Sequence, residues 1–258
     1  MNHLQSRVDQ QVLILTLDRP AKKNALTADM YQALADAVSQ ADGRDDVAAV
    51  LLRGAAGNFS SGNDISLFVQ GHGHGHGRSE SPALAFMQAV LGLRKPLVAC
   101  VRGHAVGIGA TVLLHCDYVV ASDDARIRFP FVDLALCPEF GSTLLLSRIV
   151  GRAKASEWLL LGAAIPAAQA CQAGLVNQVL PAELAEEEAL SVAKRLAAKP
   201  RQALAATRAL LRQADEEGLL RRLQQESATL NTLRQSAEAQ ALFKSFLERQ
   251  PSMAASGQ

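Results

Sequence analysis

One glutamate in this sequence joins a titratable side chain to an apolar setting, the combination that acid–base chemistry requires. Glu139 lies in Cys137–Thr143, which reads CPEFGST. Burial among apolar neighbours disfavours an ionised carboxyl and raises its pKa toward a value at which it can take and return a proton. The alternative is that Glu139 caps a helix near 141–149, and Asp133 is a weaker second carboxylate. The expected apolar neighbours are Phe131, Leu134, Leu136, Pro138 and Phe140.

Two glycine-containing turns supply a second chemical element, free backbone amides. Leu97–Val101 reads as a buried strand and Ile108–Cys116 as a buried helix, with Gly107 and Gly109 between them. The first amides of a helix have no intrahelical acceptor, so this turn could hold an anionic oxygen. A second such turn, FSSGND, follows a strand predicted over 47–53. A tight turn without function is one alternative.

A dinucleotide-binding fingerprint is the other alternative for the first turn, since it also joins a strand to a helix through glycines. After Gly107 and Gly109, its third glycine would fall at position 112, which is Val112. The spacing therefore argues against a nicotinamide cofactor.

The elements that position these groups alternate between strand and helix. Val12–Asp18 is a strand candidate that Pro20 closes, and Thr27 is a predicted N-cap for an amphipathic helix over Ala28–Ala41. Pro82–Leu93 reads as a further helix. This order predicts an α/β fold. Beyond Pro181 four helical segments are expected, over 183–198, 202–214, 219–233 and 237–249.

The sequences of several motifs resemble those of the crotonase superfamily of enoyl-CoA hydratases and isomerases. These motifs are LDRPAKKNALT (Leu17–Thr27), FSSGNDI, KPLVACVRGHAVGIGA, CDYVVASDDARIRFP and QACQAGLVNQVLP (Gln169–Pro181). The resemblance implies the ClpP/crotonase fold, a spiral of repeated β-β-α units followed by a C-terminal α-helical region. It divides the chain into a core with the acyl-CoA site at 1–197 and a helical oligomerisation region at 198–258.

The resemblance also implies a site. Asn63 and Ile108 would supply the two amides of an oxyanion hole, and an acyl-CoA thioester would be the substrate. Lys22 to Ala25 would line the adenine end of coenzyme A, although Lys22 and Lys23 also suit a solvated turn. The full set of implied substrate-binding residues is Lys22, Lys23, Ala25, Ser61, Gly62, Asp64, Ile65, Gly107, Phe131, Leu136 and Pro138.

Carboxylates distinguish the reactions within this superfamily. The positions at which hydratases carry their two glutamates are Thr111 and Phe131 here, and neither can titrate usefully. Glu139 matches the single base of the isomerase branch. The resemblance is closest to the 3,2-trans-enoyl-CoA isomerases of that branch. The expected activity is isomerisation of 3-enoyl-CoA to trans-2-enoyl-CoA in fatty-acid or related acyl-CoA breakdown. A hydratase, an isomerase of a ring-derived acyl-CoA, and a non-catalytic acyl-CoA-binding subunit remain alternatives.

Composition limits the partners. The 258 residues are 49% hydrophobic and 20% charged, with a formal net charge of +1, so nothing favours nucleic acid or an anionic membrane. The four cysteines lie far apart without a metal-ligand spacing, which favours free thiols in a reducing compartment. The N-terminus lacks a signal-peptide pattern, so cytoplasm is expected.

No cofactor or metal is expected, and coenzyme A enters as part of the substrate. The resemblance implies a homotrimer or a dimer of trimers.

Histidines receive structural interpretations. His72, His74 and His76 alternate with glycines in GHGHGHGR, which favours a flexible lid beside the acyl pocket over a metal tract. His115 lies inside an apolar segment, where a hydrogen-bonded core residue is expected. His104 and His115 are also the candidate bases for a serine-nucleophile mechanism. That mechanism is disfavoured because no G-x-S-x-G motif occurs.

Overall fold

The structure is a computed structural model that describes residues 3–69, 81–213 and 216–249. Its main sheet has six strands in the order β1-β2-β3-β4-β6-β9. The edge strand β1 is antiparallel to β2, and every other neighbouring pair is parallel. The strands are β1 (Leu4–Asp9), β2 (Val12–Leu17), β3 (Ala49–Gly54), β4 (Leu97–Val101), β6 (Tyr118–Ser122) and β9 (Gln178–Leu180).

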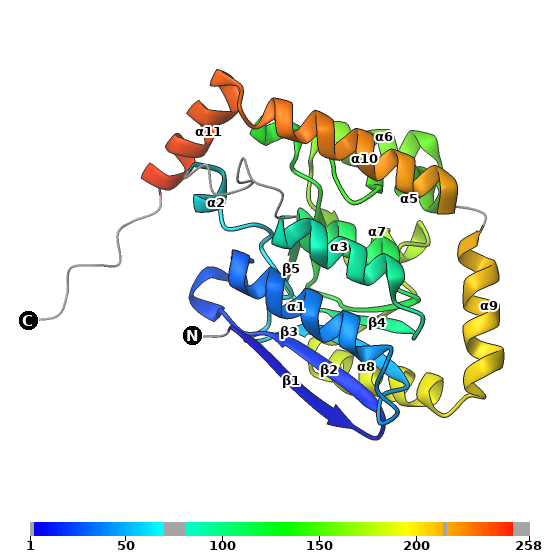
Figure 1. Ribbon diagram of the computed structural model, residues 1–258. Coiled ribbons are helices and arrows are strands. Elements are labelled where there is room, and N and C mark those ends of the chain that lie inside the picture. The colour runs from blue at the N-terminus through cyan, green and yellow to red at the C-terminus, as the bar shows by residue number, and fades with distance from the viewer. Residues whose placement is uncertain (1–2, 70–80, 214–215, 250–258) are drawn as a thin grey trace, which may run out of the picture.

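Helices cover both faces of this sheet (Figure 1). Side chains alternate along a strand, so Leu13 and Leu15 of β2 join the apolar cluster of α1 (Ala28–Ala41) and α3 (Pro82–Gly92). Val12 and Ile14 point the other way, into the cluster of α8 (Ala182–Ala197). Burial on both faces explains why β2 reads as a continuous apolar run.

A second, three-stranded sheet carries one of the glycine turns. Its order is β5-β7-β8, from β5 (His104–Val106), β7 (Arg126–Arg128) and β8 (Ile165–Pro166). Ser60 bridges to this sheet, because its N–H donates to the His104 carbonyl (2.8 Å) and its carbonyl accepts from Val106 (2.9 Å). These bonds bring the turn after β3 next to the turn after β5.

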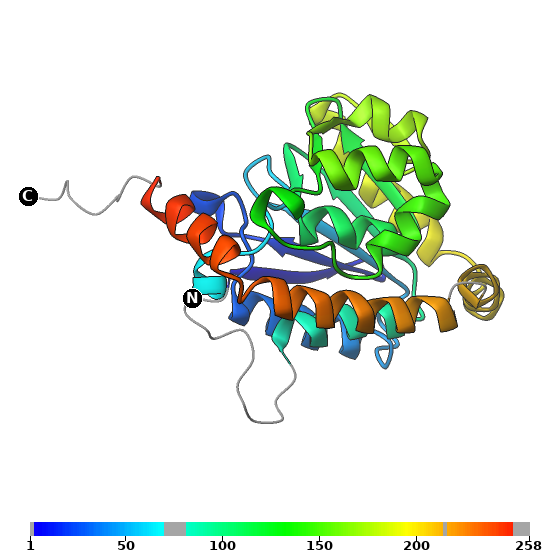
Figure 2. The ribbon, with the colours of Figure 1, turned by 90° about the horizontal axis from the view of Figure 1, so that it is seen from above.

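Helices at the C-terminus complete the molecule. α10 (Glu216–Leu233) returns across the top of Figure 1 and packs against α5 (Ser142–Val150), whereas α9 (Arg201–Gln213) stands at the side in both Figure 1 and Figure 2. α11 (Ala237–Glu248) packs on α2 (Ser66–Val69) through a stacked Phe68–Phe243 pair with ring centroids 5.1 Å apart. The remaining helices are α4 (Ile108–Thr111), α6 (Arg152–Leu161) and α7 (Ala167–Gln172). No helix in the described part of the chain is long and apolar enough to span a membrane.

Most expected elements are confirmed. The Thr27 hydroxyl accepts from the Met30 N–H (3.2 Å) and α1 covers the predicted range. The helix expected over 108–116 is α4 followed by a 3₁₀ turn over Val112–His115, so the segment is helical but tightens midway. α8 packs on the sheet and ends at Ala197, before α9 begins; the division of the chain at 197/198 stays a prediction. The histidine tract at 72–76 lies outside the described residues.

Candidate active site

The two glycine turns converge. Gly62 (φ 93°) and Gly107 (φ 57°) both have positive φ angles, and a Cβ on Gly62 would lie 2.8 Å from the Val106 carbonyl oxygen. A Cβ on Gly107 would lie 3.9 Å from the Gly62 Cα. Only glycine allows this backbone conformation and this close approach without strain. The spacing of the glycines in the sequence therefore reflects direct contact between the turns.

Each turn presents an unpaired backbone amide. The Gly62 carbonyl and the Asp64 N–H both bond Leu26 (2.8 and 3.0 Å), so the intervening Asn63 N–H faces the opposite side. Ile108 is the first residue of α4, where amides lack an intrahelical acceptor. Within the described residues, neither the Asn63 nor the Ile108 N–H donates a hydrogen bond. Two such donors in adjacent turns suit an oxyanion that develops on a thioester carbonyl.

Glu139 lies in a cavity beside Asn63. Its side chain is buried, with Oε1 accepting a hydrogen bond from the Thr111 hydroxyl (2.6 Å), while Oε2 has no partner among the residues that the structure describes. Burial raises the pKa of Glu139 to about 8, although the Thr111 hydrogen bond lowers it, and the charge of Glu226 adds to the rise. The cavity is lined by Ala28, Tyr31, Asn63, Leu67, Phe68, Ser81, Pro82, Ala83, Leu84, Met87, Glu139, Phe140, Leu223, Ser227, Leu230, Asn231 and Arg234.

The backbone beside Glu139 adopts an unusual conformation that aromatic packing holds. Phe140 (φ 62°) and Gly141 (φ 71°) both have positive φ angles. The Phe140 ring stacks on His115 with centroids 3.9 Å apart, and its carbonyl accepts from His115 Nε2 (2.8 Å). Burial lowers the pKa of His115 to about 3, so this imidazole is neutral. The structural interpretation of His115 is confirmed.

A second buried glutamate, from α10, holds the same loop. Glu226 Oε2 accepts from the Gly141 N–H (2.6 Å), and Oε1 accepts from the N–H and hydroxyl of Thr143 (2.9 and 2.5 Å). Glu226 therefore caps α5, and the alternative that Glu139 caps this helix is wrong. Burial raises the pKa of Glu226, against the lowering effect of these hydrogen bonds. The sequence analysis missed Glu226 because it is 87 positions beyond Glu139 and has no local motif.

Tyr31 is another polar residue of the site that no sequence motif marks. Its hydroxyl donates a hydrogen bond to the Asn63 side-chain oxygen. A side chain of α1 thus holds Asn63, whose backbone N–H is one of the two amides without an acceptor among the described residues. Tyr31 is buried, and burial followed by the charge of Glu139 raises its pKa well above the usual value. Only its place on the buried stripe of α1 marks it in the sequence, and that stripe predicts packing rather than polar contact.

The residues implied to bind the substrate all lie outside the lining of this cavity, whereas Asn63, implied as an oxyanion-hole residue, is part of it. Lys22 and Lys23 are exposed, and their carbonyls accept from the Ser61 hydroxyl and N–H (both 2.9 Å). Asp64 pairs with Arg19 (2.7 Å), which occupies its carboxylate with a structural contact. Within the described residues, the members of the set outside the cavity lining are Lys22, Lys23, Ala25, Ser61, Gly62, Asp64, Ile65, Gly107, Phe131, Leu136 and Pro138.

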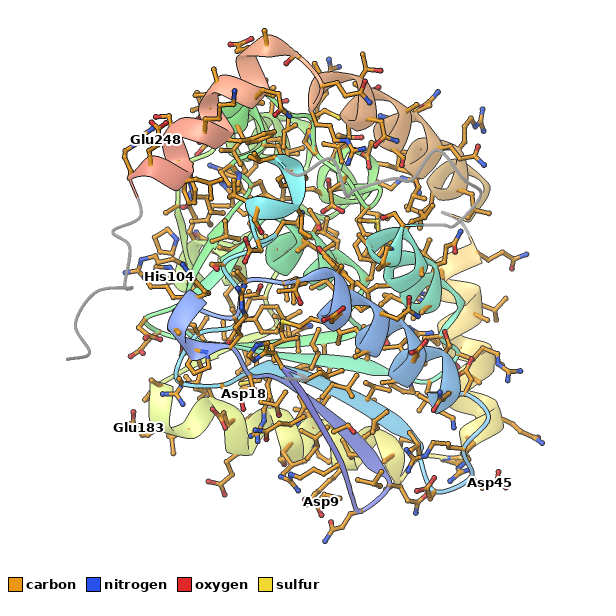
Figure 3. All side chains as sticks on the ribbon, turned by 60° about the vertical axis from the view of Figure 1, so that its left-hand side comes forward. Asp9, Asp18, Asp45, His104, Glu183 and Glu248 are labelled. Atoms are coloured by element: carbon orange, nitrogen blue, oxygen red, sulfur yellow. The ribbon has the colours of Figure 1, made fainter. Side chains whose placement is uncertain are left out.

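Other candidate groups lie elsewhere. Phe131, Leu136 and Pro138 are buried, and the first two belong to the main apolar cluster. Asp133, the second carboxylate candidate, is exposed and pairs with Arg128 (2.9 Å) at the surface. His104 lies toward the edge of the molecule in Figure 3. In the part of the chain that the structure describes, no cluster of three or more histidine, cysteine and acidic side chains could hold a metal.

The geometry defines an α/β protein whose two contacting glycine turns offer amides beside a buried carboxylate. A sequence model of the enoyl-CoA hydratase/isomerase family matches residues 7–254, and the chain belongs to this family, within the crotonase superfamily. It is 35% identical to the 2,3-dehydroadipyl-CoA hydratase of Escherichia coli K12, over 93% of both chains. It is also 35% identical to enoyl-CoA delta isomerase 2 of Rattus norvegicus, over 93% of this chain and 62% of that protein.

Solved structures agree with the sequence comparison. The structure of OdaA from Pseudomonas aeruginosa superposes with a TM-score of 0.91 at 38% identity, over 96% of this chain and 100% of that one. An enoyl-CoA hydratase/isomerase from Pseudoalteromonas atlantica T6c gives a TM-score of 0.90 at 33% identity, over 96% and 97%. The crotonase-like α/β fold expected from the motifs is confirmed, and the chain is an enzyme of this family.

Proposed function

We propose that this enzyme isomerises 3-enoyl-CoA to trans-2-enoyl-CoA with Glu139 as its single base. The observation that carries the proposal is that Glu139 is the one carboxylate lining the cavity within the described residues. Thr111, at one hydratase position, donates a hydrogen bond to Glu139 instead of supplying a second acid–base group. One base can move one proton between two carbons, whereas hydration also requires the activation of water.

In the proposed reaction the thioester carbonyl accepts from the N–H groups of Asn63 and Ile108. Glu139 takes a proton from C2, and the electron pair of that C–H bond moves into a dienolate whose charge gathers on the carbonyl oxygen. The protonated Glu139 then gives the proton to C4, and the double bond moves from C3–C4 to C2–C3. Each amide of this kind is worth about 100- to 1,000-fold in rate. The reaction involves no redox change, so we expect no cofactor.

The test offers the unmodified protein 3-hexenoyl-CoA and crotonyl-CoA in separate assays. Double-bond migration is followed by the absorbance of the conjugated thioester, and water addition by its loss. We expect isomerisation to exceed hydration by at least about 100-fold, the usual contribution of one acid–base group. Equal rates would refute the single-base assignment.

Hydration is the second candidate, because the relative from Escherichia coli that matches over 93% of this chain is named a hydratase. The same pair of assays decides between the two. A hydratase would add water to crotonyl-CoA without moving the double bond of 3-hexenoyl-CoA. In that case a group other than Glu139 would have to activate the water.

We also propose that the protein assembles as a trimer or as a dimer of trimers. Support comes from α9, where Leu210 and Leu211 are 70% and 76% exposed. Adjacent leucines with this exposure suit burial against another subunit. Light scattering after size exclusion tests this directly, and a monomer at micromolar concentration would refute it.

A further inference from the structure

One end of the active-site cavity is polar and lies away from Glu139. Near Glu139, α10 contributes Glu226, which bonds the Gly141 amide. Arg234 follows eight residues later, directly after the last residue of α10, which places it about 12 Å farther along the helix axis at 1.5 Å per residue. The Arg234 N–H still bonds the Leu230 carbonyl (2.9 Å), so helical geometry extends to this residue. The cavity therefore runs along α10.

The residues of α10 that line this cavity follow helical spacing. Ser227, Leu230, Asn231 and Arg234 stand at positions i, i+3, i+4 and i+7, so they lie on one face of the helix. The opposite wall is apolar where it comes from α2 and α3, with Leu67, Phe68, Ala83, Leu84 and Met87. An acyl chain would thus pass apolar side chains before it reached Asn231 and Arg234.

Arg234 has no counterion among the described residues. It is half-buried, and burial lowers the pKa of its guanidinium. Within residues 3–69, 81–213 and 216–249, its side chain has no hydrogen-bond or ion-pair partner, and neither has the side chain of Asn231. A partly desolvated cation without a partner is unfavourable, and an anion beside it would remove that cost.

The coenzyme A part of the substrate is not expected at Arg234. The segment implied to line the adenine end of coenzyme A, Lys22 to Ala25, is outside the described lining of the cavity. Asn63, implied as an oxyanion-hole residue, is part of that lining. A thioester carbonyl at the Asn63 amide would direct its acyl chain into the cavity, toward α10.

We propose that Asn231 and Arg234 form a subsite for a carboxylate at the far end of the acyl chain. The preferred substrates would then be coenzyme A thioesters of medium-length dicarboxylic acids rather than of simple fatty acids. The guanidinium supplies charge-assisted hydrogen bonds and the Asn231 amide supplies a further donor. The proposal rests on the proposed function for the position of the thioester, and it adds the chemical class of the acyl chain.

Binding of unreactive ligands tests the proposal independently of the isomerase reaction. Calorimetry would compare hexanoyl-CoA and octanoyl-CoA with the saturated dicarboxylic thioesters adipyl-CoA and suberyl-CoA. We expect at least one dicarboxylic ligand to bind about 10- to 100-fold more tightly than the neutral ligand of equal length, the range for a hydrogen bond to a charged group. Tighter binding of the neutral chain at both lengths would overturn the proposal.

Two variants identify the group responsible. Arg234→Gln should remove the preference for the dicarboxylic ligand and change the affinity for hexanoyl-CoA less than about threefold. Arg221→Gln removes the same charge from an exposed position on the same helix and should leave the preference intact. An equal loss of affinity for both ligands in Arg234→Gln would place a coenzyme A phosphate at Arg234 and overturn the proposal. None of these outcomes depends on whether the protein isomerises 3-enoyl-CoA.

Discussion

Replacing Glu139 by glutamine should abolish turnover and at the same time stabilise the protein at alkaline pH. Glutamine keeps the size of the side chain and can still accept the Thr111 hydrogen bond through its amide oxygen. It cannot carry a proton between carbons, so we expect the kcat for 3-hexenoyl-CoA to fall by about 100- to 10,000-fold. Affinity for a saturated acyl-CoA should change only a few fold, because the amides of Asn63 and Ile108 are untouched.

The effect on stability follows from the raised pKa of Glu139, about 8 instead of 4.5. Below pH 4.5 the group is protonated in both the folded and the unfolded protein, so burial causes no pH-dependent loss. As pH rises from 4.5 to 8, the unfolded chain ionises while the folded one stays protonated, and the free energy of unfolding falls. Above pH 8 both states are ionised and the loss levels off at about 5 kcal/mol.

The measurement is urea unfolding of the wild type and Glu139→Gln at pH 5, 7 and 9. Other titrating groups are common to both proteins and cancel in the difference. Between pH 5 and pH 9, the free energy of unfolding of Glu139→Gln should rise by about 4 kcal/mol relative to that of the wild type. Glu183→Gln, at an exposed residue labelled in Figure 3, controls for the removal of one carboxylate. If the free energy of unfolding changed with pH in the same way for wild type and Glu139→Gln, the pKa of Glu139 would not be raised in the folded protein.

Three further variants test the surroundings of this base. Thr111→Val removes the hydrogen bond that lowers the pKa of Glu139, so the midpoint of the pH profile of kcat/KM should move to higher pH; an unchanged midpoint would contradict the contact. Tyr31→Phe releases the Asn63 side chain and should lower kcat about tenfold with little change in KM, whereas an equal effect on both would indicate a role in binding only. Glu226→Ala leaves the amides of the Glu139 loop without an acceptor and should lower the free energy of unfolding by about 2 to 4 kcal/mol in urea titrations; a loss below 1 kcal/mol would refute its anchoring role.

Local patterns predicted the parts of this fold that depend on local physics. The apolar stripe and N-cap of α1 were sufficient because burial of one helix face and capping by Thr27 act within a few residues. The short strands β5, β7 and β8 were missed, since two or three residues carry no readable periodicity and pair only through tertiary contact. In the candidate site too, some residues stand in local motifs and others are brought in by long-range contacts.

Glu139 and the glycine turns stand in compact motifs, so the sequence identified them. Long-range packing brings Tyr31 and Arg234 to the cavity and Glu226 to the loop after Glu139, and their own segments read as ordinary amphipathic helix. In such a segment a polar residue is expected on the solvated face, and only the fold reveals that it lies inside. The sequence therefore indicated Glu139 and the two turns as candidate groups, whose catalytic roles stay predictions, and it could not indicate the contacts that hold them.

The contacts of α10 explain how a base with an unfavourable ionised form is kept in position. Ionisation of Glu139 is opposed by burial, and exposure of the loop to water would bring its pKa back toward 4.5. Glu226 opposes this exposure by accepting from the amides of Gly141 and Thr143, and the stack on His115 holds Phe140. A buried carboxylate from the C-terminal helices thus maintains the base strength of another in the core. If Glu139 is the base as proposed, we expect these helices to support catalysis as well as the proposed assembly, because separating α10 from α5 would expose the Glu139 loop and lower its pKa even if every residue of the core stayed in place.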